Sequence, residues 1–161
     1  MQNIKNRGLV FNGQPTPVPY FTFAVTGVCN YKCSYCCLGA ENHGFEGEEI
    51  PLDEMLEIAS IFYKKGVKIF RITGGEPTIW KPLEDLIKWI HDIAPDTHVN
   101  LNSNASLPRK LIPILERNPE RFTLRVSVDR MTPAPDTPKV WTPRLEETLK
   151  EARKYVPGSL S

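Results

Sequence analysis

Three cysteines, Cys29, Cys33 and Cys36, occur in the order C-x-x-x-C-x-x-C, and Cys37 is the only other cysteine of the chain. Thiolates bind zinc ions and iron–sulfur clusters. Disulfides normally join distant segments, so thiols crowded into one loop favour metal or redox chemistry. A four-iron cluster on three cysteines keeps one iron open to a small molecule, whereas a zinc site would need a fourth ligand such as His43. Cys37 is expected to be a small packing residue.

The segments around this loop alternate between strand and helix patterns. The spacing of apolar residues predicts strands over 20–26, 67–73, 97–103 and 122–128. It predicts helices over 51–66, 81–94, 106–118 (with Ser106 as the N-cap) and 143–156, the last after a proline-rich loop over 131–143. A βαβαβαβα order implies parallel strands with right-handed crossovers, and a site at their carboxyl ends.

The two faces of the expected strands differ in polarity. One face is apolar, with Phe21, Phe23, Val25, Phe70, Ile72, Val99, Leu101, Leu124, Val126 and Val128. The other carries Thr22, Ala24, Thr26, Ile69, Arg71, Thr73, Asn100, Asn102, Asn104, Arg125, Ser127 and Asp129. A doubly wound sheet would need two apolar faces. We therefore predict an α/β fold, a partial (β/α) barrel of about four parallel βα units whose polar inner face surrounds a cavity. The alternative is an open sheet with this face in solvent.

Composition narrows the class of protein. The formal net charge of +1 gives no strong electrostatic footprint for nucleic acid or a membrane surface. The sequence has neither an apolar run of membrane-spanning length nor a signal-peptide pattern, so we expect a cytoplasmic protein whose thiols stay reduced. A single domain over 1–161 is expected, with an N-terminal extension (1–18), a motif-bearing core (19–130) and a final loop and helix (131–161).

Four motifs follow the predicted strands in order. After the cysteine motif, with the aromatic Tyr35 before its last cysteine, come "TGGEP" (73–77), "NSNAS" (102–106) and "RVSVD" (125–129). This set resembles the radical S-adenosylmethionine (SAM) superfamily, particularly the branch of cyclic pyranopterin synthases and peptide-modifying enzymes, over about residues 19–130. The resemblance implies that Cys29, Cys33 and Cys36 hold a [4Fe–4S] cluster with SAM on its open iron.

The resemblance also implies contacts to SAM. Gly74, Gly75 and Glu76 would meet the methionine ammonium, with Pro77 fixing the turn. The other implied SAM contacts are Asn104, Ser127 and Asp129 toward the methionine carboxylate or ribose, and Tyr35 near the adenine. Arg71 and Arg125 would bind an anionic group of the substrate or of SAM, or pair with acidic neighbours. Structural roles remain open too: a mere turn for the glycines and Asn104, a helix N-terminal carboxylate for Glu76, and exposed polar strand ends for Ser127 and Asp129.

The implied activity is the reductive cleavage of SAM to a 5′-deoxyadenosyl radical that abstracts hydrogen from an unidentified substrate. It needs a one-electron reductant such as flavodoxin or ferredoxin. The chain departs from the family in showing four βα units where six are usual, and in carrying Ala105 where the family has glycine. Two alternatives therefore stay open: a non-enzymatic iron–sulfur or zinc protein, and an inactive fragment or half-barrel that needs a partner subunit or a second copy.

Overall fold

The computed structural model describes residues 10–11, 14–15, 20–36 and 49–157. Its main sheet has four parallel strands in the order β3-β4-β5-β6. These strands are β3 (Tyr20–Ala24), β4 (Ile69–Thr73), β5 (His98–Ser103) and β6 (Phe122–Val126). The helices are α1 (Leu52–Lys64), α2 (Leu83–Ile93), α3 (Pro108–Arg117) and α4 (Pro143–Tyr155), with a 3₁₀ turn η1 (Pro77–Ile79) before α2. The predicted α/β partial barrel of parallel βα units is confirmed.

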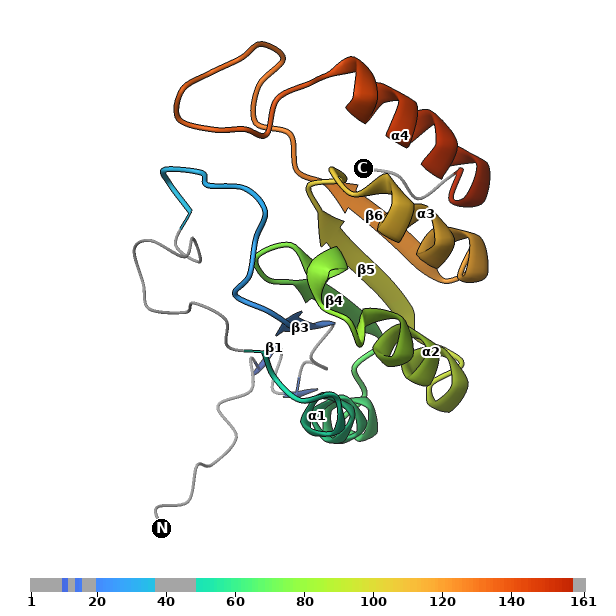
Figure 1. The fold of residues 1–161 in the computed structure, drawn as a ribbon. Helices are drawn as coiled ribbons and strands as arrows, with labels where there is room; N and C mark the ends of the chain where they lie inside the picture. The colour runs from blue at the N-terminus through green and yellow to red at the C-terminus, as the bar shows by residue number, and fades with distance from the viewer. Residues whose placement is uncertain (1–9, 12–13, 16–19, 37–48, 158–161) are drawn as a thin grey trace.

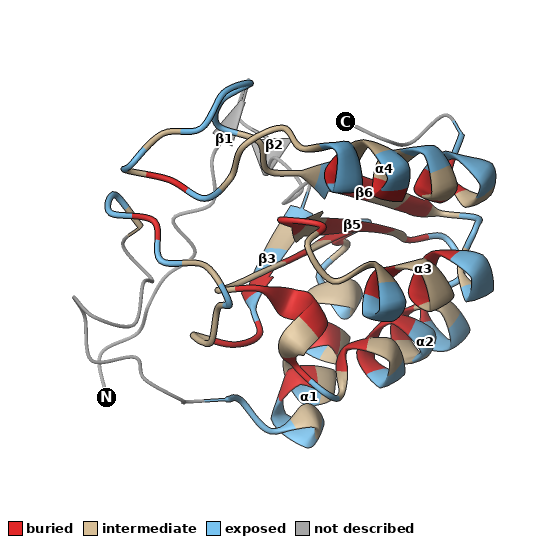
Figure 2. Cartoon of the chain, turned by 45° about the horizontal axis from the view of Figure 1, so that its top comes forward, coloured by how far each residue is buried: buried red, intermediate tan, exposed pale blue. Residues whose placement is uncertain are grey.

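All four helices lie on one side of this sheet (Figure 1). Strand register explains why, because it aligns apolar residues across the sheet on that side. Phe21, Phe70, Val99 and Phe122 form one row, and Phe23, Ile72, Leu101 and Leu124 form the next. The helices turn their buried residues toward these rows (Figure 2), so the core is the single layer between sheet and helices.

The opposite face of the sheet carries the polar residues that strand alternation predicts. One row runs through Thr22, Arg71, Asn100 and Thr123 in register. Thr22, Ala24 and Arg125 are exposed, whereas Asn100 is only 7% exposed. Within the described ranges no helix covers this face, as expected for the inner face of a partial barrel.

Two local features differ from the sequence expectations. Ser106 is not the N-cap of α3: Leu107 precedes the helix and makes no side-chain cap. The Ser106 hydroxyl instead accepts a hydrogen bond from Asn30 Nδ2 at 2.8 Å, because the loop after β5 lies against the cysteine loop. The N-terminal segment also contains a short antiparallel pair, β1 (Val10–Phe11) and β2 (Gln14–Pro15), that no sequence pattern indicated.

Candidate functional site

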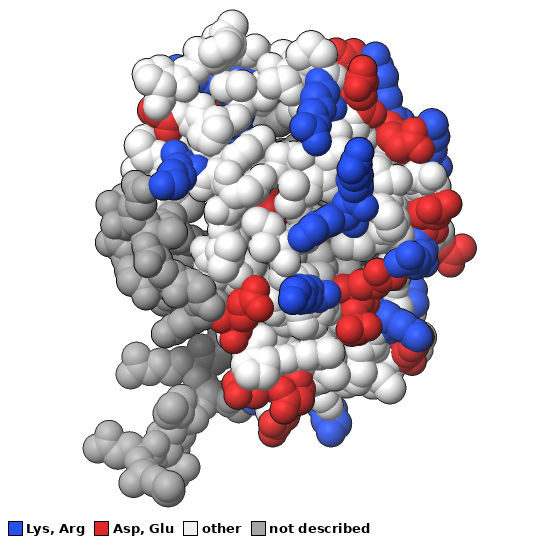
Figure 3. Space-filling model, viewed as in Figure 1, with Lys and Arg blue, Asp and Glu red and all other residues white. Residues whose placement is uncertain are grey.

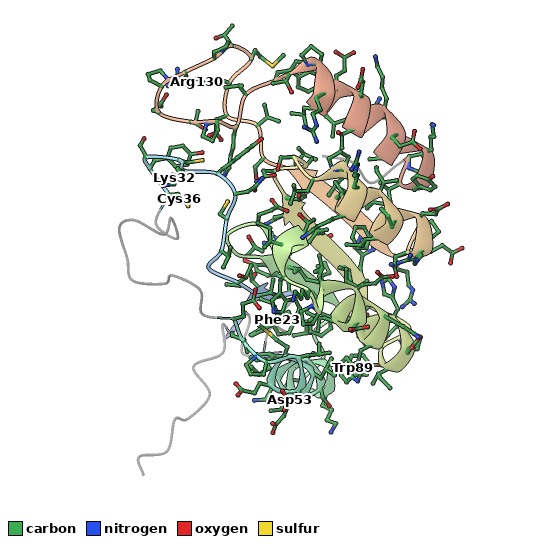
Figure 4. The ribbon with its side chains drawn as sticks, viewed as in Figure 1. Phe23, Lys32, Cys36, Asp53, Trp89 and Arg130 are labelled. Atoms are coloured by element: carbon green, nitrogen blue, oxygen red, sulfur yellow. The ribbon has the colours of Figure 1, made fainter. Side chains whose placement is uncertain are left out.

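The carboxyl ends of the four strands meet at one edge of the sheet, and each leads into a segment carrying a motif. We call residues 27–36 the cysteine loop, 74–77 the glycine turn and 130–141 the proline-rich segment. In Figure 4, Lys32 and Cys36 of the cysteine loop and Arg130 lie at the same end of the molecule, away from Asp53 and Trp89. The topology thus brings the predicted motifs together, as parallel strands require.

The glycine turn runs directly against the start of the cysteine loop. Gly75 N donates to Thr26 O at 2.7 Å, and Glu76 N donates to Val28 O at 2.9 Å. A Cβ at Gly75 would lie 2.2 Å from Val28 O, and one at Gly74, whose φ is +141°, would lie 2.5 Å from Thr26 O. No side chain fits between these backbones. Both glycines are therefore needed because they allow the backbone of the glycine turn to contact the backbone at the start of the cysteine loop.

Glu76 is buried at the centre of this edge, 1% exposed. Its Oε1 accepts hydrogen bonds from Thr78 N (3.2 Å), Thr78 Oγ1 (2.7 Å) and Ser103 Oγ (2.8 Å), and its Oε2 accepts one from Asn104 N (2.8 Å). Glu76 is also the N-cap of η1, which Pro77 begins. The carboxylate therefore joins the ends of β4 and β5, and both of its oxygens accept hydrogen bonds from the protein itself.

Asn104 connects β5 to the cysteine loop. Its Nδ2 donates to Asn30 Oδ1 at 3.0 Å, and its Oδ1 accepts from Ser106 N at 2.9 Å. Ala105, between Asn104 and Ser106, has φ +53° and is 2% exposed. An alanine in this left-handed backbone conformation is destabilised by about 1 kcal/mol relative to a glycine. The family's glycine at this position thus has a conformational reason, and the alanine here keeps the same conformation.

The three cysteines of the motif are free thiols with different surroundings. Cys33 is buried, 7% exposed, and its Sγ lies 3.8 Å from Thr137 Oγ1. Cys29 and Cys36 are partly exposed; Cys29 Sγ accepts from Tyr31 N at 3.4 Å, and Cys36 N donates to Cys33 O at 3.1 Å. Burial raises the pKa of the Cys29 thiol, a hydrogen bond from Tyr31 opposes this, and the charges of Glu76 and Cys33 add to it. Without a metal, this thiol therefore favours its protonated form at neutral pH.

The three thiols are separate from one another in the described structure. In the part of the chain that the structure describes, no three His, Cys, Asp or Glu side chains are grouped closely enough to hold one metal ion. Three thiols on one short loop are the ligand type that iron–sulfur clusters use. Polar groups close to a cysteine sulfur, as Thr137 Oγ1 is to Cys33 Sγ, are of the kind that tune the reduction potential of such clusters. His43 and Cys37 lie outside the described residues.

The proline-rich segment packs on the cysteine loop, although about a hundred residues separate them in sequence. Ser34 donates to Asp136 O through its backbone N (3.1 Å) and its Oγ (3.0 Å). Thr137, 4% exposed, lies against Cys33 and donates to Asp129 Oδ2 at 2.6 Å. The segment is closed on itself by an ion pair between Arg130 and Asp136 at 3.1 Å. It therefore forms one wall of the cysteine site.

Tyr35 and Asp129 also contribute to the packing between the cysteine loop and the proline-rich segment. The Tyr35 hydroxyl donates to Asp129 Oδ2, and Lys139 Nζ lies 5.8 Å from the centre of the Tyr35 ring. Desolvation and the hydrogen bond to Asp129 raise the pKa of Tyr35. Desolvation also acts to raise the pKa of Asp129, but hydrogen bonds from Thr137 and Tyr35 outweigh it, so the net shift is downward. Asp129 is therefore ionised at neutral pH and engaged within the protein.

A small pocket of about 100 Å³ opens at the ends of β5 and β6. Asn104 and Ser127 line it, as do Tyr31, Lys139 and Arg144. Ser127 N donates to Ser103 O at 3.0 Å, which continues the pairing of these two strands past their ends. Asn104 and Ser127, both predicted to contact SAM, therefore line the same pocket as the cationic side chains of Lys139 and Arg144.

The two predicted anion-binding arginines lie on the polar face of the sheet. Arg71 stacks over the ring of Tyr20 at 3.6 Å, and its buried Nε has no hydrogen-bond partner among the described residues. Arg125 is exposed and aligns with Asn102 across the sheet. Neither arginine forms an ion pair with a described residue.

Sequence reasoning missed several residues that shape the site. Asn30, Ser103 and Thr137 each make contacts across elements that only the fold brings together. Thr137 and Asp136 lie between prolines in a stretch that the sequence indicated only as a loop. Asn30 and Ser103 lie within the cysteine motif and the "NSNAS" motif, but the sequence pattern assigned neither of them a role.

The fold and the cysteine site together define the class of protein. The family model described as the radical SAM superfamily matches residues 23–160, so the chain belongs to that superfamily, which uses a [4Fe–4S] cluster and SAM. The predicted family and cofactors are confirmed at this level. Among curated relatives, GTP 3′,8-cyclase of Helicobacter pylori (strain ATCC 700392 / 26695) is 35% identical over 115 residues, covering 71% of this chain and 36% of the relative. GTP 3′,8-cyclase of Sulfurovum sp. is 31% identical over 127 residues, covering 78% of this chain and 38% of the relative.

Solved structures agree with the fold. Streptococcus suis SuiB bound to SAM superposes with a TM-score of 0.65 at 18% identity, covering 86% of this chain and 31% of SuiB. SuiB bound to precursor peptide SuiA superposes with a TM-score of 0.58 at 20% identity, covering 71% of this chain and 25% of SuiB. The chain spans about a third of the length of these proteins. None of the helices in the described ranges is long and apolar enough to cross a membrane.

Proposed function

We propose that this chain forms the cluster- and SAM-binding part of a radical SAM enzyme, with Cys29, Cys33 and Cys36 as the cluster ligands. The observation that supports this most strongly is the three free thiols on one loop, packed against the glycine turn at the carboxyl edge of the sheet. When bound, a reduced four-iron cluster supplies the electron that cleaves SAM to methionine and a 5′-deoxyadenosyl radical. The protein's own residues position SAM, tune the cluster and shield the site.

We propose that Gly74, Gly75 and Pro77 serve SAM through their backbone. Because Glu76 uses its carboxylate to join β4 and β5, this residue would offer SAM its backbone carbonyl, while its side chain fixes the turn. Asn104 and Ser127, which line the pocket at the ends of β5 and β6, would contact the methionine carboxylate or the ribose.

Tyr35 and Asp129 are the remaining SAM contacts of the proposal. The Tyr35 ring is 55% exposed and stands beside Cys36, so it offers a free face to the adenine. Asp129 hydrogen-bonds Tyr35 and would act through it, in addition to any contact with the ribose. The core over 19–130 and the segment over 131–161 would thus build one site as a single domain.

The substrate belongs on the polar face of the sheet. Arg71 and Arg125 lie there without acidic partners among the described residues, and a guanidinium suits phosphate or carboxylate groups. The relatives are named for GTP, which carries such groups. GTP is therefore the first substrate to test, with a peptide as the second.

The strands β3 and β6 each leave one edge unpaired within the described sheet. Unpaired edges invite another strand. We propose that further strands, a partner subunit or a second copy complete the barrel. We also propose that a flavodoxin or ferredoxin supplies the electron, in the cytoplasm, where the thiols stay reduced.

The test is anaerobic reconstitution with iron and sulfide, followed by SAM and dithionite, with 5′-deoxyadenosine measured by chromatography. The protein should form 5′-deoxyadenosine, Cys33→Ala should abolish it, and Cys37→Ala should retain it as the matched control. A four-iron cluster without 5′-deoxyadenosine would favour the inactive half-barrel. Stoichiometric zinc instead of a cluster would favour the structural alternative.

A further inference from the structure

A basic groove lies on the helix side of the site edge, away from the polar face of the sheet. It runs between η1 with the start of α2 and the first turn of α3, and has a volume of about 340 Å³. Lys81, Arg109 and Lys110 line it together with Thr78, Trp80 and Glu84. Figure 3 shows blue Lys and Arg side chains gathered over the middle of this face, with red Asp and Glu side chains along its outer side.

The three cations of the groove are available to a partner. Lys81, Arg109 and Lys110 are exposed, and none forms an ion pair with another described residue. Glu84, the carboxylate in the groove lining, is already paired with Arg117. Fold stability does not explain the charges either, because Arg109 and Lys110 stand in the first turn of α3, where cations oppose the helix dipole.

A short series of hydrogen bonds connects the groove to the cysteine loop. Thr78, in its wall, donates its hydroxyl to Glu76 Oε1 at 2.7 Å. Glu76 N in turn donates to Val28 O at 2.9 Å, and Val28 precedes Cys29 in the chain. Electron tunnelling falls steeply with distance, so a protein that reduces a cluster must dock on a surface with such a short connection to its ligands.

We propose that this basic groove is the docking surface of an acidic one-electron carrier protein. The proposal rests on the proposed function, since the carrier delivers its electron to the cluster held by Cys29, Cys33 and Cys36. One electron passes from the reduced carrier to the oxidised cluster, so the carrier is oxidised and no proton or bond needs to move. The polar face of the sheet stays free for SAM and substrate.

The size and charge of the groove suit this partner better than a nucleic acid. Complexes for electron transfer are small and weak, and opposite charges steer their encounter. A nucleic-acid surface would combine a longer basic track with exposed aromatic rings. Here Trp80 is 2% exposed, and acidic side chains bound the groove on its outer side.

The test compares two double charge reversals of equal size. Arg109→Glu/Lys110→Glu alters the groove, and glutamates at that helix start are favourable for folding. Lys64→Glu/Lys65→Glu is the matched control at the end of α1, at the opposite edge of the sheet. Bacterial flavodoxin is the carrier probe and dithionite is the small reductant. Stopped-flow absorbance gives the rate of cluster reduction, and calorimetry gives the flavodoxin Kd of the cluster-free protein.

We expect the groove variant to lower the rate with flavodoxin at least tenfold and to raise the Kd at least fivefold. The control variant should stay within twofold of the parent, all three should react equally with dithionite, and added salt should weaken flavodoxin binding by the parent. A groove variant that binds flavodoxin and is reduced by it as well as the parent would overturn the proposal.

Two further results would also contradict the docking surface. One is a parent protein that binds neither flavodoxin nor an acidic ferredoxin in a salt-dependent way. The other is loss of binding to a fluorescent single-stranded oligonucleotide in the groove variant with flavodoxin binding unchanged, which would make the groove a nucleic-acid site. Failure to form a cluster or 5′-deoxyadenosine with dithionite would instead count against the proposed function, while the Kd comparison still tests the groove.

Discussion

The glycine turn and the cysteine loop follow neighbouring strands and contact each other, but different interactions stabilise them. The turn is stabilised by its own residues: the Glu76 carboxylate is buried and accepts four hydrogen bonds, and the two glycines allow close approach of the neighbouring backbone. The loop is held from outside, by Ser34, Tyr35 and Cys33 contacts to the proline-rich segment and its flank. The carboxylate of the turn is engaged within the protein, whereas the thiols of the loop are free.

This contrast allows the stability of the cluster-free protein and its ability to bind a cluster to be changed separately. Changes in the turn should lower the free energy of unfolding of the cluster-free protein, because they break buried contacts. A change at the partly exposed Cys36 should leave that free energy nearly unchanged and remove the cluster. The predictions below are ordered by their expected effect on the stability of the cluster-free protein.

Gly75→Ala should have the largest effect. The new Cβ would lie 2.2 Å from Val28 O and 2.8 Å from Gly27 O, both backbone atoms that no rotamer change can move. We expect a loss of about 3 kcal/mol in urea unfolding, because such overpacking displaces the backbone. Gly66→Ala is the control, since Gly66 has φ +92° but open space around it and should cost only about 1 kcal/mol of backbone strain. Equal losses in the two variants would refute the close-approach argument.

Glu76→Gln should be the next most damaging. The amide keeps the shape of the side chain but turns an NH₂ group toward Asn104 N or toward the donors from Thr78 and Ser103. A buried donor facing another donor costs about 2 kcal/mol. Urea unfolding of the cluster-free protein measures this loss. An unchanged midpoint would mean that the carboxylate is free for a ligand and does not hold the turn.

Asp129→Asn should have a smaller effect that depends on pH. Its folded pKa lies below the ordinary value of 3.8, so ionised Asp129 contributes its stability above pH 3.8, and the contribution is lost as the pH falls through the folded pKa. Because the residue is exposed, we expect a cost of about 0.5–1 kcal/mol at pH 7. The melting temperatures of variant and parent should converge below pH 3.8. A constant difference across this range would show that charge plays no part.

Cys36→Ala should have the smallest effect on the cluster-free protein, less than about 0.5 kcal/mol, because the thiol is partly exposed and makes no described side-chain hydrogen bond. The same variant should lose most of its iron after reconstitution, measured by elemental analysis. A variant that keeps the full iron content would remove Cys36 from the ligand set.

The sequence predicted the fold well because its signals are local. Alternation along each strand separated Phe70 and Ile72 from Arg71, and strand register then placed these residues as expected. The cysteine and glycine motifs were found at the ends of their strands for the same reason. Family, fold class and cofactors follow from such short-range patterns.

The sequence did not reveal contacts between segments that are distant along the chain. Glu76 was assigned to a ligand because its motif suggests one, but Ser103 and Asn104 reach it only through the β4–β5 register. Thr137 lies against Cys33 across 104 positions. Ser106 has the residue type of an N-cap, yet Asn30 provides a hydrogen-bond partner that no local pattern could indicate.

The central claim, that three cysteines leave one iron open for SAM, is tested most directly by electron paramagnetic resonance. The reconstituted, dithionite-reduced protein should give the signal of a reduced four-iron cluster. Addition of SAM should change the g-values, while S-adenosylhomocysteine changes them less. A cluster signal that SAM leaves untouched would contradict the account, because it would mean that no iron of the cluster is open to SAM.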